Sequence, residues 1–290
     1  MTICTKGGFF FRRRETRNGP LVTNFLFWNV NGKPLESRVA SIVRTHDIDV
    51  VALAECDPTS GAWLDAISDV QQCPYYQGTT LLDSIAVYTR FRQRTMEEDP
   101  RTRVSAHQLF LPGGKDVVLV VAHLPSKLFW QADSQSQLCT EFAAQVRRLE
   151  TRVGHSRTVL VGDLNMNPFE AGVVSSHGLH ATMARSVAER ETRTVLGKEY
   201  AFFYNPMWGH FGDALDGPPG TYYDSRAEAV TYFWNLFDQV LVRPALLGAF
   251  DTGSVRILDS DGTESLLSRT GLPEKSQASD HLPIVFRLDM

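Results

Sequence analysis

The sequence predicts an α+β protein built on two packed β-sheets. Short apolar strands alternate with amphipathic helical segments along the chain. Gly113-Gly114 separates the expected strands 104–109 and 117–122 as the turn of a hairpin would. The run 117–121 is apolar throughout, as in a strand buried on both faces. Hairpins mixed with strand–helix units fit two packed sheets better than one purely parallel sheet.

Hydrophobic periodicity places the individual elements. Strands are expected at 23–29, 49–54, 84–89, 104–109, 117–122, 158–162, 236–242, 255–258 and 282–288, and helices at about 35–46, 58–72 and 138–153. Residues 205–226 and 259–279 are rich in Gly, Pro, Ser and Asp and are expected to be loops. Neither a repeat nor a linker interrupts the chain, so residues 21–290 are expected to form a single domain.

The composition is that of a globular protein with enough material for a core. The 290 residues are 43% hydrophobic and 21% charged, and the formal net charge of −4 is not that of a typical polyanion binder. The chain has no apolar run of the roughly 18 residues that a membrane helix needs. Phe9-Phe10-Phe11 is too short for a signal-peptide core, so the predicted location is the cytoplasm. The four cysteines lack CxxC spacing and are expected to be free thiols.

Polar side chains follow, interrupt or immediately precede six of the apolar strands. They are Asn29 and Asn31, Glu55, His123, Asp163 and Asn165, Asp238, and the Asp280-His281 pair. Each has an ordinary structural explanation, such as a turn, a helix cap or a solvated strand end. Together they provide the carboxylate, carboxamide and imidazole groups that Mg²⁺-assisted phosphate chemistry requires.

The order of these motifs resembles that of a known superfamily. The motifs are WNVNG (28–32), LAE (53–55), AHL (122–124), GDLN (162–165), FDQVLV (237–242) and SDH (279–281). This ordered set is similar to that of the endonuclease/exonuclease/phosphatase superfamily, over about residues 23–288. The resemblance implies the DNase I-like four-layer sandwich, in which two mixed β-sheets are flanked by helices and the site lies at one end of the sheets.

The resemblance also implies a metal site. Glu55 resembles the principal Mg²⁺ ligand, and Asn31 and Asp280 resemble the residues that assist it; Mn²⁺ is the alternative ion. A hard cation of this kind prefers oxygen ligands and retains several waters. The oxygen-bearing side chains of these three residues fit that preference.

The remaining roles concern water and phosphate. Asp163 resembles the group that orients and deprotonates the attacking water, and Asn165 the residue that holds the phosphate or water beside it. His281 is expected to face the scissile phosphate, with Asp238 as its orienting partner. His123 and Asn29 are expected to donate hydrogen bonds to the non-bridging oxygens, where charge builds in the transition state.

The leading functional prediction is a Mg²⁺-dependent nuclease that acts on DNA or RNA. The expected substrate-binding residues are Lys127, Trp130, Tyr204, Asn205 and Tyr222, whose rings and polar groups suit bases and phosphates. His123 stands where AP endonucleases usually carry a Tyr-containing loop, which argues against abasic-site repair. A phosphodiesterase or phosphatase for a small molecule or lipid headgroup is the alternative. A non-catalytic binding module is disfavoured, because every motif position keeps a competent side chain.

Residues 1–20 precede the first motif and form a basic arm. They contain Lys6, Arg12, Arg13, Arg14 and Arg17 against the single acid Glu15. A disordered, solubilising tail is the ordinary expectation for such a terminus. On a nucleic-acid substrate the arm would add phosphate contacts outside the cleft. The sequence specifies neither a membrane interaction nor an obligate protein partner.

Overall fold

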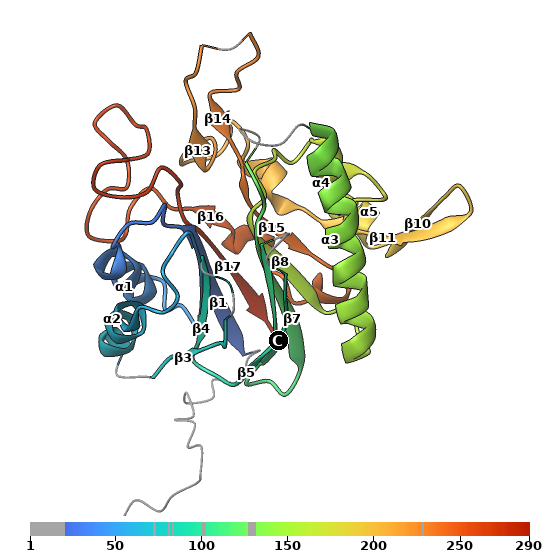
Figure 1. Ribbon diagram of the computed structural model, residues 1–290, viewed down its shortest axis with the longest axis horizontal. Coiled ribbons are helices and arrows are strands. Elements are labelled where there is room, and N and C mark those ends of the chain that lie inside the picture. Colours follow the sequence, from blue (N-terminus) through green and yellow to red (C-terminus); the bar gives the residue numbers. More distant parts are fainter. Residues whose placement is uncertain are drawn as a thin grey trace, which may run out of the picture.

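The computed structural model describes residues 21–71, 74–80, 82, 84–99, 103–126, 132–227 and 229–290. The basic arm, Cys4, Cys73, Lys127 and Trp130 lie outside these residues. Two β-sheets pack face to face, and helices cover the outer face of each sheet (Figure 1). This is the predicted four-layer sandwich. In the described part of the chain, no helix has both the length and the apolar character needed to cross a bilayer.

The first sheet has six strands in the order β16-β17-β1-β2-β4-β3. Its strands are β1 (Val22–Asn29), β2 (Val50–Ala54), β3 (Tyr76–Gln77), β4 (Ile85–Thr89), β16 (Arg256–Ile257) and β17 (Ile284–Asp289). The sheet is mixed, because β1 pairs in parallel with β2 and antiparallel with β17. Helices α1 (Glu36–Thr45) and α2 (Gly61–Gln71) lie on its outer face (Figure 1).

The second sheet has seven strands in the order β5-β6-β7-β8-β15-β12-β9. Its strands are β5 (Gln93–Asp99), β6 (Val104–Phe110), β7 (Asp116–His123), β8 (Thr158–Asp163), β9 (Ala181–Thr182), β12 (Phe203–Tyr204) and β15 (Asp238–Val242). It is also mixed, since β7 and β8 are parallel and β8 and β15 antiparallel. The long helix α3 (Ala132–Val153) covers its outer face (Figure 1).

Short elements complete the fold. They are α4 (Ala171–Val174), α5 (Arg185–Ala188), the hairpin of β10 (Thr192–Val195) with β11 (Lys198–Ala201), the pair β13 (Tyr222–Tyr223) and β14 (Trp234–Asn235), and the 3₁₀ turns η1 (Pro206–His210), η2 (Pro244–Leu246) and η3 (Thr252–Ser254). The loop between β13 and β14 projects at the top of the molecule (Figure 1).

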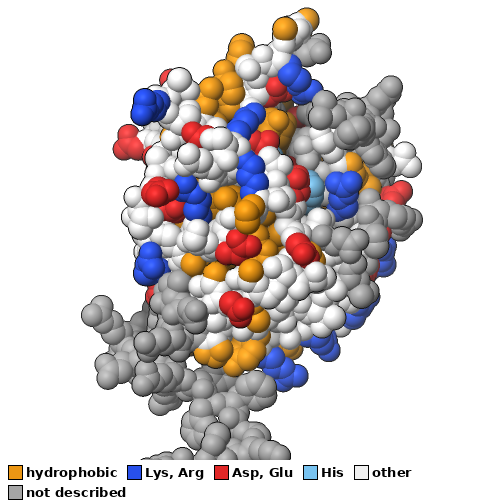
Figure 2. Space-filling view, turned by 60° about the vertical axis from the view of Figure 1, so that its left-hand side comes forward, with side chains coloured by type: hydrophobic (Ala, Val, Ile, Leu, Met, Phe, Trp, Pro, Cys, Tyr) orange, Lys and Arg blue, Asp and Glu red, His pale blue; other side chains and the backbone are white. Residues whose placement is uncertain are grey.

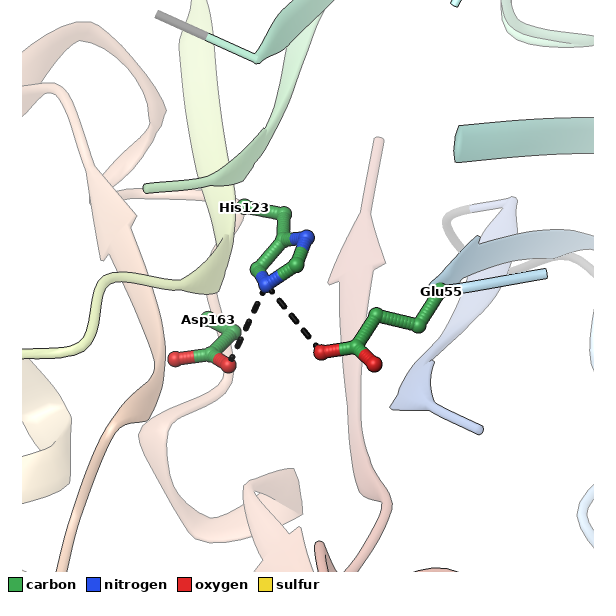
Figure 3. A group of neighbouring side chains, drawn as sticks. All are labelled: Glu55, His123 and Asp163. Carbon is green, nitrogen blue, oxygen red and sulfur yellow. Dashed lines mark ion pairs between the residues drawn. The ribbon is translucent and has the colours of Figure 1, made fainter. Parts of the chain in front are cut away.

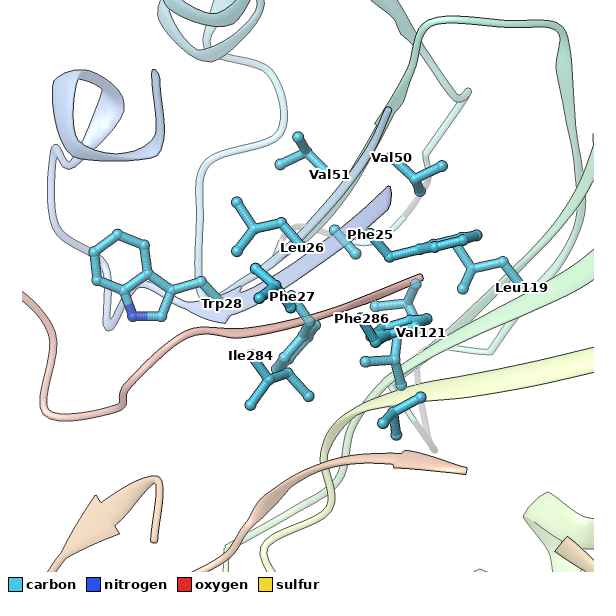
Figure 4. Close-up of a cluster of buried hydrophobic side chains, with 14 of the residues drawn as sticks. Phe25, Leu26, Phe27, Trp28, Val50, Val51, Leu119, Val121, Ile284 and Phe286 are labelled. Atoms are coloured by element: carbon cyan, nitrogen blue, oxygen red, sulfur yellow. The ribbon is translucent and has the colours of Figure 1, made fainter. Parts of the chain in front are cut away.

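Aromatic and branched side chains fill the space between the sheets (Figure 4). Phe25 of β1 stacks on Phe286 of β17 with ring centroids 4.8 Å apart. The apolar run of β7 alternates as expected for a strand covered on both faces. Leu119 and Val121 belong to the core between the sheets, and Val118 and Val120 pack in the cluster with α3. The prediction of a doubly buried strand is therefore confirmed.

The hairpin predicted around Gly113-Gly114 is also confirmed, since β6 and β7 pair antiparallel from Val104↔Ala122 to Phe110↔Asp116. The long helix begins earlier than the periodicity indicated, at Ala132. Cys56 and Cys139 are buried free thiols.

Candidate active site

Strand pairing brings the polar strand ends to one edge of the sandwich. In the first sheet Asn29 pairs with Ala54, so Glu55 leaves β2 beside the end of β1. In the second sheet Asp163 pairs with His123 on one side and with Asp238 on the other. Residues that are far apart in the sequence therefore meet where the two sheets face each other.

The Asn29 side chain joins the two sheets at this edge. Its Nδ2 donates to Glu55 Oε1 at 3.0 Å and to Asp163 Oδ2 at 3.0 Å. Its Oδ1 accepts from the Asn31 backbone N–H at 3.0 Å. Asn29 is fully buried, and its bond to Asp163 forms away from water and holds that acid firmly. One carboxamide thus fixes the separation of the two acids.

Three site residues turn the chain sharply where their strands end. Asn31, Glu55 and Asn165 have φ angles of 52°, 50° and 50°, in the left-handed region that non-glycine residues seldom adopt. The turn at Glu55 is fixed by a bond from the Gly32 N–H to the Glu55 carbonyl at 2.8 Å. Asn165 is fixed by its N–H, which donates to Asp163 Oδ1 at 2.9 Å.

Glu55, His123 and Asp163 converge from three different strand ends (Figure 3). His123 Nε2 lies 3.2 Å from Glu55 Oε1 and 3.9 Å from Asp163 Oδ2. The hydrogen bond from His123, with that from Asn29, outweighs burial and lowers the pKa of Glu55 to about 2. Glu55 is therefore a carboxylate at any physiological pH, and 37% of its side chain is exposed to a ligand.

Asp238 and His281 form the predicted pair. Asp238 Oδ2 accepts from His281 Nδ1 at 2.8 Å, and both side chains are buried. Burial alone would lower the pKa of His281, but the charges of Asp238 and Asp163 outweigh it and raise that pKa to about 10. The ring is thus an imidazolium whose Nε2 lies 3.7 Å from Asp163 Oδ2.

The backbone around His281 is held by side chains from the first sheet and its loops. Trp28 Nε1 donates to the His281 carbonyl at 2.8 Å, and Ser279 Oγ donates to the Asn29 carbonyl at 2.6 Å. Thr221 Oγ1 accepts from the Asp238 N–H at 3.1 Å. Neither Ser279 nor Thr221 was expected to have a role, although Ser279 belongs to the SDH motif.

The oxygen ligands expected for a divalent cation lie on segments that are bonded to one another. The Asn31 turn is tied to Glu55 through Gly32, and Ser279, beside Asp280, is tied to Asn29. Asp280 Oδ1 is buried and accepts no hydrogen bond from any described residue. An unpartnered buried carboxylate oxygen is costly unless a cation or water satisfies it. The donor set of two carboxylates and a carboxamide therefore fits a hard divalent ion.

Of the five expected substrate-binding residues, Lys127 and Trp130 lie outside the described residues, and the structure places the other three. Tyr222 lies at the site, with its ring 4.8 Å from the His281 ring and 5.4 Å from that of Phe237. Tyr204 packs in the core between the sheets. Asn205 is fully buried, and it donates to Gln239 Oε1 at 2.8 Å and accepts from the Met207 N–H at 3.0 Å. The structure does not bring Tyr204 and Asn205 to the cluster, so no substrate role is proposed for them.

A lysine near Tyr222 was not expected from the sequence. Lys275 Nζ lies 5.5 Å from the centroid of the Tyr222 ring and donates to the Tyr223 carbonyl at 3.5 Å. Among the described residues it forms no ion pair with a carboxylate. Lys275 lies in a polar loop and belongs to none of the motifs, and only the fold shows that it is close to Tyr222.

The comparison with family profiles decides the classification. The profile described as "Endonuclease/Exonuclease/phosphatase family" matches residues 26–281. The chain belongs to this family. Members are generally hydrolases of phosphodiester or phosphate bonds and use divalent metal ions. The comparison with curated proteins finds no match.

Solved structures show the same family fold at low sequence identity. D. rerio TDP2, in a structure described as complexed with a single-strand DNA product, is 17% identical with a TM-score of 0.56, over 93% of this chain and 99% of that one. A family protein from Bacteroides thetaiotaomicron is 14% identical with a TM-score of 0.55, over 93% and 98%. One from Beutenbergia cavernae is 19% identical with a TM-score of 0.51, over 93% and 72%. At these identities the likeness concerns the fold alone.

Proposed function

We propose that this family member is a Mg²⁺-dependent phosphodiester hydrolase that cleaves nucleic acid by in-line attack of water. The observation that carries the proposal is the bridge from Asn29 to both Glu55 and Asp163 at 3.0 Å. It places a permanently ionised carboxylate and a buried candidate base on either side of one amide. The imidazolium of His281 lies next to that base, at 3.7 Å.

Each residue then has a distinct task. Glu55, Asn31 and Asp280 would hold the divalent ion, which when bound would neutralise charge on the phosphate. Asp163 would orient the water and accept its proton. His281, kept charged by Asp238, would stabilise the negative charge that develops on the phosphate or its leaving oxygen. His123 and Asn29 would support the same oxygens, and Asn165 would hold the phosphate or water.

The surroundings of the site support a nucleic-acid substrate. Next to Tyr222 in the chain, Tyr223 contacts Trp234, with the two ring centroids 5.5 Å apart. Lys275 lies beside the Tyr222 ring. Phe233 is 51% exposed, and hydrophobic side chains gather at the tip of the projecting loop between β13 and β14 (Figure 2). Aromatic rings beside a cation suit stacked bases and their phosphates. The single-strand DNA product described for D. rerio TDP2 is in keeping with this substrate class. The cytoplasmic location remains a prediction.

The test compares Glu55→Gln with the wild type on plasmid DNA, single-stranded DNA, RNA and bis(p-nitrophenyl) phosphate. Each substrate is incubated with MgCl₂, with MnCl₂ and with EDTA. We expect divalent-dependent cleavage of a nucleic acid that falls about 100-fold or more in the variant, because the ion loses its principal charged ligand. Glu141→Gln, an exposed position on α3, is the matched control and should keep full activity.

Four results would contradict the proposal. Cleavage that persists in EDTA, or a Glu55→Gln variant with wild-type turnover, would remove the metal role of Glu55. Hydrolysis of bis(p-nitrophenyl) phosphate without cleavage of any nucleic acid would favour a small-molecule phosphodiesterase. Cleavage of none of the four substrates would favour the binding-module alternative.

A further inference from the structure

A second candidate site lies at the other end of the seven-stranded sheet. Asp238 begins β15 beside Asp163, whereas Val242 at its far end pairs with Tyr204 of β12. β12 runs antiparallel to β15 and parallel to β9, so the residues that precede β9 and β12 lie away from the active site. A cavity of about 400 Å³ opens there, and its lining includes Val187 of α5 and the first residues of β10. Figure 1 labels α5 and the β10–β11 hairpin.

The cavity is lined by two arginines without acidic partners. Arg190 and Arg193 form no ion pair with any carboxylate in the described part of the chain. Two neighbouring acids are bonded elsewhere, since Glu189 accepts from Arg185 at 3.3 Å and Glu199 from Thr192 at 3.1 Å. Glu191, between the two arginines in sequence, is exposed and pairs with neither. Two unpaired guanidinium groups at a cavity favour an anion, and phosphate above all.

His180 also lines the cavity, and its side chain is buried. Its Nδ1 lies 3.3 Å from the Ala201 carbonyl, which can only accept, so Nδ1 carries the proton. Burial lowers the pKa of His180 and favours the neutral ring, while the hydrogen bond to the Ala201 carbonyl acts in the opposite direction and offsets this only in part. Nε2 is then a lone-pair acceptor, and no described residue donates to it although the side chain is only 3% exposed.

The geometry of His180 is fixed rather than adaptable. Its ring stacks on Phe202 with centroids 4.1 Å apart and an interplanar angle of 23°. Its backbone has a φ of 52°, a conformation that costs a non-glycine residue free energy and is often kept at functional positions. The stacked ring is therefore a rigid part of the cavity wall, and the charged groups offered to a ligand there are the two arginines.

We propose that this cavity binds an organic phosphate of mononucleotide size. Arg190 and Arg193 hold the phosphate, and the ring of His180 forms part of the wall. Val174, Val187 and Phe202 provide an apolar wall for the base or another ring. A volume of about 400 Å³ lies within the range of small-molecule sites and suits one nucleotide. This site is separate from the hydrolytic one and does not depend on the proposed function.

The test is calorimetric titration of the full-length protein with AMP, adenosine and inorganic phosphate, in EDTA so that no divalent ion recruits them to the active site. We expect AMP to bind, and to bind at least tenfold more tightly than either fragment. The double variant Arg190→Gln/Arg193→Gln changes exposed side chains, so it should fold, and it should weaken AMP binding at least tenfold. The control Arg148→Gln/Arg152→Gln removes the same charge from α3 and should bind AMP as the wild type does.

Other outcomes overturn the proposal. AMP that binds the double variant as tightly as the wild type, or that fails to bind the wild type at 10 mM, excludes the site. If inorganic phosphate binds as tightly as AMP, the site does not recognise the organic part of the ligand. If adenosine binds as tightly as AMP, the site does not recognise the phosphate. Hydrolysis by the double variant should match the wild type, and a fall in its turnover would contradict the separation of the two sites.

Discussion

At the level of single residues, the active site depends on side chains that the sequence identifies and on contacts that it does not. The motif letters pointed to Asp163 and to the pairing of Asp238 with His281, which the 2.8 Å contact confirms. They did not indicate that Asn29 would donate to two acids at once. That arrangement depends on how the two sheets pack against each other, which hydrophobic periodicity does not specify. Nor could a polar loop reveal that Lys275 lies beside Tyr222.

The three site residues with positive φ angles also show how far the sequence alone can predict the site. Asparagine adopts positive φ more readily than most residues, so Asn31 and Asn165 are unsurprising in such turns. Glu55 has no such preference, and its conformation costs about 1 kcal/mol or more. The bonds from Asn29, His123 and Gly32 hold it there. Strain at this position is a consequence of placing a carboxylate where the two sheets meet.

Asp238→Asn tests the charged pair. Asparagine keeps the volume and can still accept from His281 Nδ1, so the variant should fold. Without the negative charge of Asp238 the imidazolium is favoured less, because only Asp163 and Asp280 still support it, and we expect kcat to fall about 100-fold or more while KM changes little. Steady-state kinetics on the preferred substrate provides the measurement, with the exposed Asp216→Asn as control. Unchanged kcat in Asp238→Asn would refute the role of the pair.

Gly162→Ala tests the close approach of β7 and β8. A Cβ at Gly162 would lie 2.0 Å from the Ala122 carbonyl oxygen, which belongs to backbone and cannot move aside. The strands must separate next to Asp163 and His123, so we expect a loss of about 1–3 kcal/mol of unfolding free energy together with reduced activity. Gly248→Ala is the control, because its Cβ would meet nothing within 4 Å. Equal stability of the two variants would contradict this account.

At the level of elements, the sequence revealed the buried strands and overlooked the exposed or short ones. β7 and β8 are continuous apolar runs, which periodicity detects. The edge strand β5 is Gln93–Asp99, a polar segment that is extended because β6 offers it a pairing edge. The β10–β11 hairpin is exposed, and β9 and β12 contain two residues each. Tertiary pairing rather than local pattern makes these strands.

Helix α3 is attached to the end of the second sheet by a buried ion pair. Arg243 Nε donates to Glu150 Oε1 at 2.8 Å, and Nη1 donates to the carbonyls of Ala201 and Phe202, both at 3.0 Å. The Arg243 side chain is 3% exposed. A buried guanidinium that loses its carboxylate is left with an uncompensated charge.

Glu150→Gln should therefore lower the free energy of unfolding by about 3 kcal/mol. The double variant Glu150→Leu/Arg243→Met removes both charges and should lose less than the single one, since no buried charge remains. Urea denaturation followed by circular dichroism measures both. A single variant as stable as the wild type would show that the pair contributes nothing.

At the level of the whole molecule, the predicted four-layer sandwich explains why motifs so far apart in the sequence belong to one site. Glu55 comes from the first sheet and Asp163 from the second, and Asn29 bonds both. The motif order was sufficient to predict the family and to show which polar strand ends meet at one edge of the fold. It was not sufficient to find the arginine-lined cavity, because Arg190 and Arg193 lie in an exposed segment that has neither apolar periodicity nor a motif.

The second sheet also buries a histidine that makes the stability of the molecule depend on pH. His107 of β6 is 1% exposed, and its Nε2 lies 2.8 Å from Ser105 Oγ. Burial lowers the pKa of His107 to about 4 from an ordinary value of 6.5. Between these values the unfolded chain takes up a proton that the folded protein excludes. The contribution of His107 to the free energy of unfolding is therefore fully present above pH 6.5 and is lost as the pH falls toward 4.

This contribution amounts to about 1.4 kcal/mol per pH unit, or roughly 3 kcal/mol over the whole interval. His107→Gln cannot titrate, so its unfolding free energy should fall less steeply than that of the wild type between pH 6.5 and 4.5, even if it is less stable at pH 8. Ser105→Ala removes the hydrogen bond but keeps the ring, and it should retain the wild-type slope. Urea midpoints at pH 4.5, 5.5, 6.5 and 8 decide the matter, because a His107→Gln slope as steep as that of the wild type would mean that other groups cause the acid sensitivity.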